Sequence, residues 1–270
     1  MFGNTKFDVK QSEGYQFIEI TSDNPSAPNL VFLHGMFGGL SNFDALMDRL
    51  EDVNIFVPDI PLYEMKRSDL SISYLAEWVR DFINAQGIQN PILLGNSLGG
   101  HIALQYALSY PDDVAGLILT GSSGLLENDF GNTSPRRKDP EYIRKQANLT
   151  FYEDLADDTL VEEIMEVTES PIKLLKLLTI ARSTQKHNME EKLPNIKVPV
   201  LLVWGKEDII TPPEVADTFF EKIPKAELHW IERCGHAPMM ERPDEFVEYA
   251  KPFLEKFLSS NSNEKEIQSI

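Results

Sequence analysis

Cysteine is nearly absent from this sequence, because Cys234 is the only one in 270 residues. An intrachain disulfide is therefore impossible, and nothing in the composition points to an oxidising compartment. Long hydrophobic runs are missing too, since no stretch approaches the roughly 18 uninterrupted apolar residues that a membrane-spanning helix needs. Residues 1–12 are polar, without the apolar centre of a secretory signal. We therefore expect a cytoplasmic protein.

Basic residues are scarce relative to acidic ones. The chain has 25 lysines and arginines against 43 aspartates and glutamates, which gives a formal net charge of −18. Such an excess repels phosphate backbones and anionic lipid surfaces, so we expect neither a nucleic-acid partner nor a membrane partner. The length is sufficient for one large α/β domain or two small ones. No particular oligomeric state is indicated.

Short apolar runs that are typical of β-strands alternate with helical patterns along most of the chain. The strand-like runs cover residues 15–20, 29–34, 54–60, 91–95, 114–120, 198–205 and 227–232. The helical patterns cover residues 42–50, 73–86, 98–109, 213–223 and 244–258. This alternation predicts a mostly parallel sheet that is covered by helices on both faces.

The alternation stops at residues 125–192, a stretch that begins polar and turn-rich and then becomes helical in period. We therefore divide the chain into a core at residues 1–124 and 193–258, a helical insertion at 125–192, and a polar tail at 259–270 that we expect to be frayed. The insertion follows a strand end, where open α/β sheets bind ligands, so we interpret it as a lid. The alternative is a subdomain that only adds stability.

A Gly-x-Ser-x-Gly pattern covers residues 95–99, with Ser97 at its centre. The pattern follows the apolar run PILL and opens the apolar helix HIALQYAL, which is the strand–turn–helix context of a nucleophile elbow. Gly95 and Gly99 would be required because a sharp turn brings the flanking backbone close together. Ser97 is accordingly predicted to be a nucleophile, and the alternative is a serine that only caps the helix.

A serine nucleophile needs a base within hydrogen-bonding reach and a carboxylate that orients this base. His236 lies in the loop RCGHAP, just past the last strand-like run, and is the predicted base. Asp208 follows the run VLLVWG and is the predicted acid, in the chain order serine, acid, histidine, with Glu207 as its neighbouring substitute. His34 is expected to brace its own loop. The remaining histidines are interpreted as packing or surface residues: His101, His187 and His229.

The segment HGMFGG, residues 34–39, ends the second strand-like run. Its glycine-rich backbone, beginning at Gly35, can supply one N–H of an oxyanion hole, and Met36 is the predicted donor. The second donor would be the N–H of Leu98, directly after the nucleophile.

The chain resembles the α/β-hydrolase superfamily over about residues 15–257. The matching segments are LVFLHGMFGG, VPDIP, ILLGNSLGGHIALQYALSYPDDVAGLIL, PVLLVWGKEDIITP and CGHAPMMERPDEF. The resemblance implies the α/β-hydrolase fold, with an eight-stranded, mostly parallel sheet, an antiparallel second strand and a helical cap after the sixth strand. It also implies a Ser97–His236–Asp208 triad with Met36 and Leu98 at the oxyanion hole. The block GNSLGG is most similar to small esterases and to meta-cleavage-product carbon–carbon hydrolases.

These features predict a serine hydrolase that cleaves a small or medium uncharged carboxylic ester through an acyl-enzyme. We expect no cofactor and no metal, because no cluster of histidine, cysteine and carboxylate has ligand spacing. The expected partner is a small-molecule substrate in an apolar pocket. Four side chains are predicted to line this pocket: Phe37, Leu174, Leu178 and Met239.

Three other functions remain open. Hydrolysis of a carbon–carbon bond in a vinylogous diketone acid would need a cation for the substrate carboxylate, and Arg136, Arg137 and Arg182 are the candidates. The loop HGMFGG and Ala237 depart from the pattern of hydrolases with that activity. Acyl transfer or perhydrolysis would use the same triad. A non-catalytic receptor would use the fold as a ligand-binding shell.

Overall fold

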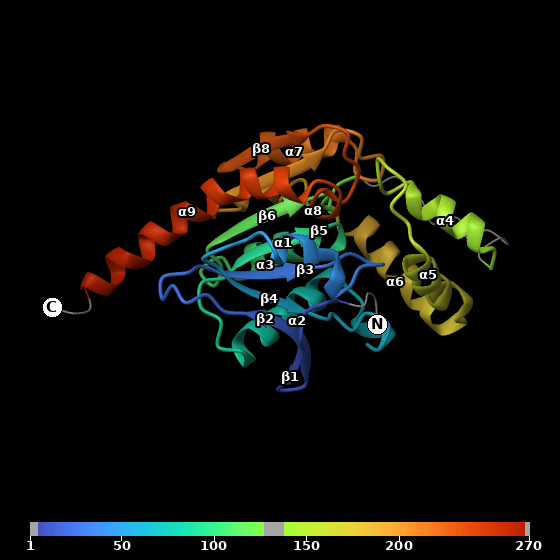
Figure 1. Cartoon of the computed structure of the whole chain (residues 1–270), viewed down its shortest axis with the longest axis horizontal. Helices are drawn as coiled ribbons and strands as arrows, with labels where there is room; N and C mark the ends of the chain where they lie inside the picture. The colour runs from blue at the N-terminus through green and yellow to red at the C-terminus, as the bar shows by residue number, and fades with distance from the viewer. Residues whose placement is uncertain (1–4, 127–137, 268–270) are drawn as a thin grey trace.

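Eight strands form one sheet in the order β1-β2-β4-β3-β5-β6-β7-β8 (Figure 1). The computed structural model describes residues 5–126 and 138–267. The strands are β1 Val9–Ser12, β2 Tyr15–Ile20, β3 Asn29–Leu33, β4 Asn54–Pro58, β5 Ile92–Asn96, β6 Gly116–Thr120, β7 Val200–Gly205 and β8 Ala226–Ile231. From β4 to β8 in spatial order all neighbours are parallel, whereas β2 is antiparallel to β1 and β4. The predicted sheet is confirmed, including its antiparallel second strand.

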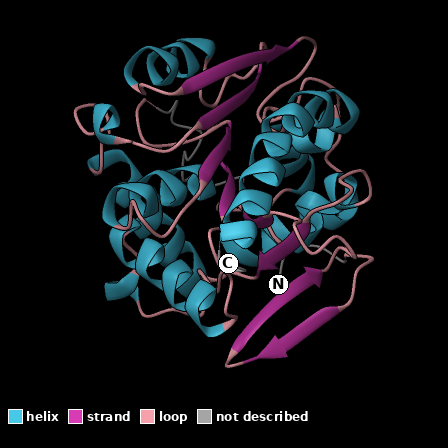
Figure 2. Ribbon diagram, turned by 90° about the vertical axis from the view of Figure 1, so that its left-hand side faces the viewer, coloured by secondary structure: helices cyan, strands magenta, loops and turns pink. Residues whose placement is uncertain are grey.

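The five central strands, β3 to β7, are apolar except at their ends because helices cover both of their faces (Figure 2). Side chains of α2 Ile72–Ala85, α3 Leu98–Ser109 and α7 Pro213–Lys222 complete the core cluster on one face. The cluster on the other face is completed by α1 Asp44–Met47, α8 Pro238–Glu241 and α9 Pro243–Ile267. The sheet is therefore buried on both sides, and its carboxyl edge is left to carry polar groups.

Strand β1 was not predicted, because its four residues, VKQS, are all exposed and show no alternation of apolar and polar side chains. It joins β2 through the two-residue turn Glu13–Gly14, in which both residues have a positive φ, 51° and 84°. Such a turn matches the twist of a hairpin. Main-chain hydrogen bonds rather than side-chain burial hold this edge strand.

Two helical boundaries differ from the predicted ones. Instead of one helix over residues 42–50, the structure has a 3₁₀ turn, Leu40–Phe43, followed by the short helix α1. The helix α9 continues to Ile267, so the part of the tail at residues 259–267 that we expected to fray is helical. Extending an existing helix costs far less than starting one, and the tail contains no proline or glycine that would end it.

In the described part of the insertion between β6 and β7 the regular elements are helices, joined by loops. The helices are α4 Pro140–Asn148, α5 Asp158–Glu169 and α6 Pro171–Lys186, and one such loop joins α4 to α5. The 3₁₀ turns Arg67–Asp69 and Leu193–Asn195 belong to the chain segments outside the insertion. Asp139, Asp157 and Ser170 cap the three helices through their side-chain oxygens. Figure 1 shows α4 to α6 at the end of the sheet toward which the parallel strands point. No helix within residues 5–126 or 138–267 is long and apolar enough to cross a membrane.

Candidate active site

Ser97 occupies the sharp turn between β5 and α3, with φ 56° and ψ −119°. A residue with a side chain rarely adopts this conformation, which costs on the order of 1–3 kcal/mol and persists only where the surroundings enforce it. The hydroxyl of Ser97 makes no capping hydrogen bond to α3. The helix-capping interpretation of this serine therefore loses its support, and the geometry is that of a nucleophile elbow.

The glycines on either side of Ser97 are required by close backbone contact. A Cβ at Gly95 would overlap the backbone of Gly99 and Gly100, and a Cβ at Gly99 would collide with the carbonyl of Leu33 at the end of β3. The strand β5 and the start of α3 thus approach each other, and α3 approaches β3, more closely than any side chain allows. This is the steric reason that the Gly-x-Ser-x-Gly pattern predicted.

The loop after β3 runs directly beside Ser97. A Cβ added to Gly35 would lie 3.3 Å from the Cβ of Ser97. Met36 follows, and its carbonyl accepts a 2.7 Å hydrogen bond from the hydroxyl of Tyr63, which fixes the orientation of the Met36–Phe37 peptide. Leu98 is the first residue of α3, so its N–H has no carbonyl partner within the helix. The two predicted oxyanion donors therefore lie on segments that border Ser97.

His34 braces this loop, as the sequence predicted. Its Nε2 accepts a 3.1 Å hydrogen bond from the N–H of Ile60, so the proton of the neutral ring resides on Nδ1, which donates to the carbonyl of Gly35 at 2.9 Å. Burial lowers the pKa of His34, which keeps the ring neutral and preserves this arrangement. The loop at Gly35 is consequently tied to the segment that follows β4.

Asp208 and His236 form a buried hydrogen-bonded pair. The Nδ1 of His236 lies 2.9 Å from Oδ2 of Asp208, whose side chain has no exposed surface. Thr211 donates its hydroxyl to the same oxygen at 2.9 Å, and the N–H groups of Ile210 and Thr211 donate to Oδ1 at 2.8 and 3.0 Å. Four donors thus hold one carboxylate. Asp208 can fix the tautomer that has its proton on Nδ1 and its lone pair on Nε2.

The alternative acid, Glu207, does not contact the imidazole of His236 through any bond that the structure records among its described residues. Its Oε2 accepts a 3.0 Å hydrogen bond from the N–H of Cys234, in the loop that precedes the histidine. Glu207 therefore anchors the backbone of this loop, while the neighbouring Asp208 binds the ring.

Asn96 joins the histidine loop to the nucleophile turn. Its side-chain amide donates to the carbonyl of His236 at 2.9 Å and to that of Thr120 at 3.1 Å, while the N–H of Ser97 donates to Thr120 at 3.3 Å. At Gly121 a Cβ would lie 2.6 Å from the carbonyl oxygen of His236. The structure thus brings the backbone of His236 against the turn that presents Ser97. No sequence pattern indicates this role of Asn96. For Thr211, which donates to Asp208, the one available signal is its position three residues after the predicted acid.

A second pair of histidines lies one helical turn beyond the nucleophile. The Nε2 of His101, on α3, is 3.0 Å from Nδ1 of His187, at the end of α6. Burial lowers the pKa of His101 to about 3 and also lowers that of His187, so both rings are neutral near pH 7. The N–H of Met189 also donates to the carbonyl of Gly124 at 2.8 Å. The sequence predicted separate packing or surface roles for the two histidines. In the structure they bond to each other and thereby attach the insertion to α3.

The four predicted pocket residues do not gather in one place. Phe37 packs at the margin of the core cluster on the α3 face, and Leu174 and Leu178 are half-buried on α6. Met239 is fully buried in the cluster on the opposite face, together with Cys234. The assignment of Met239 to the pocket is therefore corrected, because the short helix α8 turns this side chain into the core.

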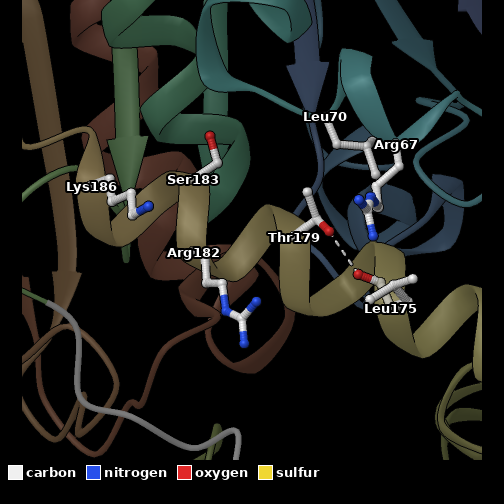
Figure 3. A pocket seen from close by; sticks show the side chains of 7 residues that line it. All are labelled: Arg67, Leu70, Leu175, Thr179, Arg182, Ser183 and Lys186. Carbon is white, nitrogen blue, oxygen red and sulfur yellow. Dashed lines mark hydrogen bonds between the residues drawn. The ribbon is translucent and has the colours of Figure 1, made fainter.

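A groove of about 350 Å³ runs between α6 and the 3₁₀ turn Arg67–Asp69 (Figure 3). It is lined by Arg67, Leu70, Leu175, Thr179, Arg182, Ser183 and Lys186. Three of these side chains are cationic, in a chain with a net charge of −18. Arg182, a predicted carboxylate-binding candidate, is one of them, whereas Arg136 and Arg137 lie outside the described residues.

A metal site finds no support within the part of the chain that the structure describes. There, no three side chains of histidine, cysteine, aspartate and glutamate converge in a way that could hold a metal ion. The polar groups around Ser97 are instead connected to each other by the hydrogen bonds described above.

Comparison with known proteins identifies the family. A sequence model of the alpha/beta hydrolase family matches residues 30–249. "Lipase 1" of Psychrobacter immobilis is 27% identical and aligns with 90% of this chain and 81% of its own length. The 2-hydroxy-6-oxononadienedioate/2-hydroxy-6-oxononatrienedioate hydrolase of Burkholderia vietnamiensis is 29% identical, over 84% of this chain and 87% of its own length. The solved structure of MGS-MChE2, an alpha/beta hydrolase enzyme from the metagenome of Mar Chica lagoon sediments, has a TM-score of 0.76 and 36% identity, and covers 92% of this chain and 98% of that one.

Proposed function

Because the chain belongs to the alpha/beta hydrolase family, we propose that it is a serine hydrolase with Ser97 as nucleophile, His236 as general base and Asp208 as the orienting acid. One observation carries the proposal: the 2.9 Å hydrogen bond between Asp208 and His236 is held, through Asn96, against the strained turn that presents Ser97. A turn of this kind, bordered by an acid–histidine pair, is the arrangement that activates a serine hydroxyl.

The reaction follows from this geometry. Ser97 Oγ attacks the ester carbonyl while Nε2 of His236 takes its proton, and Asp208 stabilises the imidazolium that forms. The N–H groups of Met36 and Leu98 donate to the oxyanion of the tetrahedral intermediate. His236 then protonates the leaving alcohol, and a water molecule hydrolyses the acyl-enzyme by the same sequence of steps.

We propose a small or medium uncharged carboxylic ester as the substrate. The excess of acidic side chains disfavours the approach of anions, and the curated relatives include a protein named as a lipase. A panel of p-nitrophenyl esters of increasing acyl length tests this class directly. Labelling of Ser97 by a fluorophosphonate, with Ser97→Ala as the control, tests the nucleophile. Hydrolysis of the esters without loss in Ser97→Ala would show that another residue is the nucleophile.

The helices α4 to α6 serve, in our proposal, as a lid that shapes the acyl pocket. Three contacts support this placement: Lys176 Nζ donates to the carbonyl of Tyr63 at 2.7 Å, His101 pairs with His187, and the N–H of His236 donates to the carbonyl of Thr150 at 2.8 Å. The insertion thus bonds to the oxyanion-loop side and to the histidine side of the site. The preferred acyl length of Leu174→Ala and Leu178→Ala, compared with that of the wild type, tests this role.

Carbon–carbon bond hydrolysis is the second candidate function, and the groove beside α6 favours it. Arg182 and Arg67 line this groove, and guanidinium groups pair well with carboxylates. One relative is named for the hydrolysis of dienedioates. A dienone acid as substrate tests this candidate, with Arg182→Gln as the variant. Turnover of the acid that is lost in Arg182→Gln, together with unchanged ester hydrolysis, would establish it. Absence of turnover of the acid by the wild type would exclude it.

A further inference from the structure

Glu241 is a buried carboxylate that the proposed reaction leaves unused. It ends the short helix α8, five residues after His236, and only 8% of its surface is exposed. Its Oε1 accepts hydrogen bonds from the N–H groups of Gly235, at 2.9 Å, and Ala237, at 3.4 Å. These are the two residues on either side of the histidine. One carboxylate oxygen therefore holds the histidine loop from both ends.

The other oxygen of Glu241 reaches into the insertion. Oε2 accepts a 2.7 Å hydrogen bond from the N–H of Tyr152, in the segment between α4 and α5. The same segment is bonded to the loop a second time, because the N–H of His236 donates to the carbonyl of Thr150. A Cβ at Gly235 would lie 2.7 Å from that carbonyl, so the two segments are in direct contact.

The three N–H donors favour the ionised form of Glu241. A carboxylate accepts from all of them, whereas a protonated carboxyl has less acceptor capacity and adds an O–H that needs an acceptor of its own. Burial raises the pKa of Glu241, and the N–H groups of Tyr152, Ala237 and Gly235 oppose that rise by favouring the charged form. The thiol of Cys234 lies 3.8 Å from Oε1 of Glu241. Burial raises the pKa of this thiol, which keeps the thiol neutral.

We propose that Glu241 is a positioning residue, whose carboxylate sets the orientation of His236 and makes that orientation depend on the Tyr152 segment of the insertion. The proposal rests on the proposed role of His236 as general base. It explains why this carboxylate lies in the interior although, among the described residues, no cationic side chain bonds to its oxygens and Arg242 acts on it only through its nearby charge. Three backbone N–H groups, none of which belongs to a regular helix or strand, replace water there.

The test compares Glu241→Gln with Glu153→Gln. In the first variant one acceptor oxygen becomes an NH₂ group that faces an N–H, so one of the two segments loses its bond. In the second, Arg242 loses an exposed 2.9 Å ion pair that joins the same two segments at the surface. Such surface pairs contribute little, so Glu153→Gln is a matched control for loosening without loss of the buried carboxylate.

Two measurements are made on both variants, with circular dichroism to establish that each is folded. For p-nitrophenyl acetate, we expect Glu241→Gln to lower kcat by about 10–100-fold with KM changed less than about twofold, because a displaced base affects the chemical step rather than binding. The second measurement is the low-field proton resonance of Nδ1–H of His236 in its bond to Asp208. It should shift or broaden in Glu241→Gln and stay unchanged in Glu153→Gln.

Wild-type kcat together with an unchanged resonance in Glu241→Gln would overturn the proposal. Equal losses of kcat in Glu241→Gln and Glu153→Gln would overturn it too. They would mean that loosening any contact between the two segments lowers kcat, so that the buried carboxylate has no special role. The resonance decides the matter even if no ester proves to be a substrate, since it reports the ring of His236 rather than turnover. A wild type that shows the resonance but no hydrolysis would therefore refute the proposed function and leave this test intact.

Discussion

The helix that follows Ser97, α3, and the last helix of the insertion, α6, are built in opposite ways. In α3, nine of 12 residues are buried, whereas α6 buries only Ile180 and Thr184 among 16. Leucines and an isoleucine of the insertion are instead exposed, as at Leu155, Ile172 and Leu175. The first helix is enforced by packing on every side. The second is attached through Ile180 and Leu177, which pack with the core, and through a few polar contacts, so much of its surface is open to adapt to a ligand.

We infer from this difference that the rigid region around α3 carries the reaction and that the less buried α6 decides which substrate is preferred. Changes around α3 should destroy activity or folding, and changes on α6 should alter which substrate is preferred.

Asp208→Asn should lower kcat by about 10⁴-fold, the loss recorded for the equivalent change in a serine protease. An amide keeps the geometry but favours the wrong tautomer of His236. Asp59→Asn, at the edge of the sheet after β4, is the control and should cost far less. Steady-state kinetics with one activated ester across pH compares them. A near-normal kcat in Asp208→Asn with a large loss in Asp59→Asn or Glu207→Gln would move the acid elsewhere.

Gly99→Ala should destabilise the fold by about 3 kcal/mol, because the added Cβ meets the carbonyl of Leu33. Gly87→Ala is the matched control: its φ is 67°, but nothing lies within 4 Å of the added atom, so it should cost only about 1 kcal/mol. Urea unfolding measures both. Equal costs would mean that small shifts of the surrounding backbone relieve the crowding at Gly99.

Acidification should destabilise the protein through His101. Its pKa is lowered to about 3 in the folded chain, so between pH 6.5 and 3 the unfolded chain binds a proton that the folded one does not. Stability is therefore lost as pH falls through that window, by at most about 1.4 kcal/mol per pH unit from this group. Unfolding free energies of the wild type and His101→Gln at pH 7 and pH 5 measure it. A steeper decline in the variant would contradict the assignment.

Leu174→Ala and Leu178→Ala should change the preferred acyl length while lowering stability by less than about 1 kcal/mol, because both side chains are only half-buried. The ester panel and the melting temperature report the two effects. An unchanged acyl profile with a clearly lowered melting temperature would instead assign the insertion a purely structural role.

The sequence was sufficient for the parts of the molecule whose pattern is local. The central strands were found because burial on both faces makes them apolar, and the turn at Ser97 because glycines must flank it. The strands and the turn share a cause, because each is required by a few consecutive residues. Chain order predicted Asp208 and His236 as acid and base, and the structure joins the two side chains by a hydrogen bond.

Features that depend on tertiary contact were missed. The pairing of His101 with His187 spans 86 residues, and the bond from Asn96 to His236 spans 140. Neither has a sequence pattern, since each depends on where two distant loops meet. The placement of Met239 failed for the same reason, because one short helix decides whether its side chain faces a ligand or the core. The exposed strand β1 has no hydrophobic signal at all.

The backbone strain at Ser97 has a consequence for durability. Glycine adopts a φ of 56° without the roughly 1–3 kcal/mol that serine stores there, and its extra freedom in the unfolded chain offsets only about 0.5–1 kcal/mol of the relief. Ser97→Gly should therefore be more resistant to heat than the wild type, and inert. A selection for heat resistance that ignores turnover would accumulate such inactive molecules, because the proposed nucleophile is also a weak point of the fold.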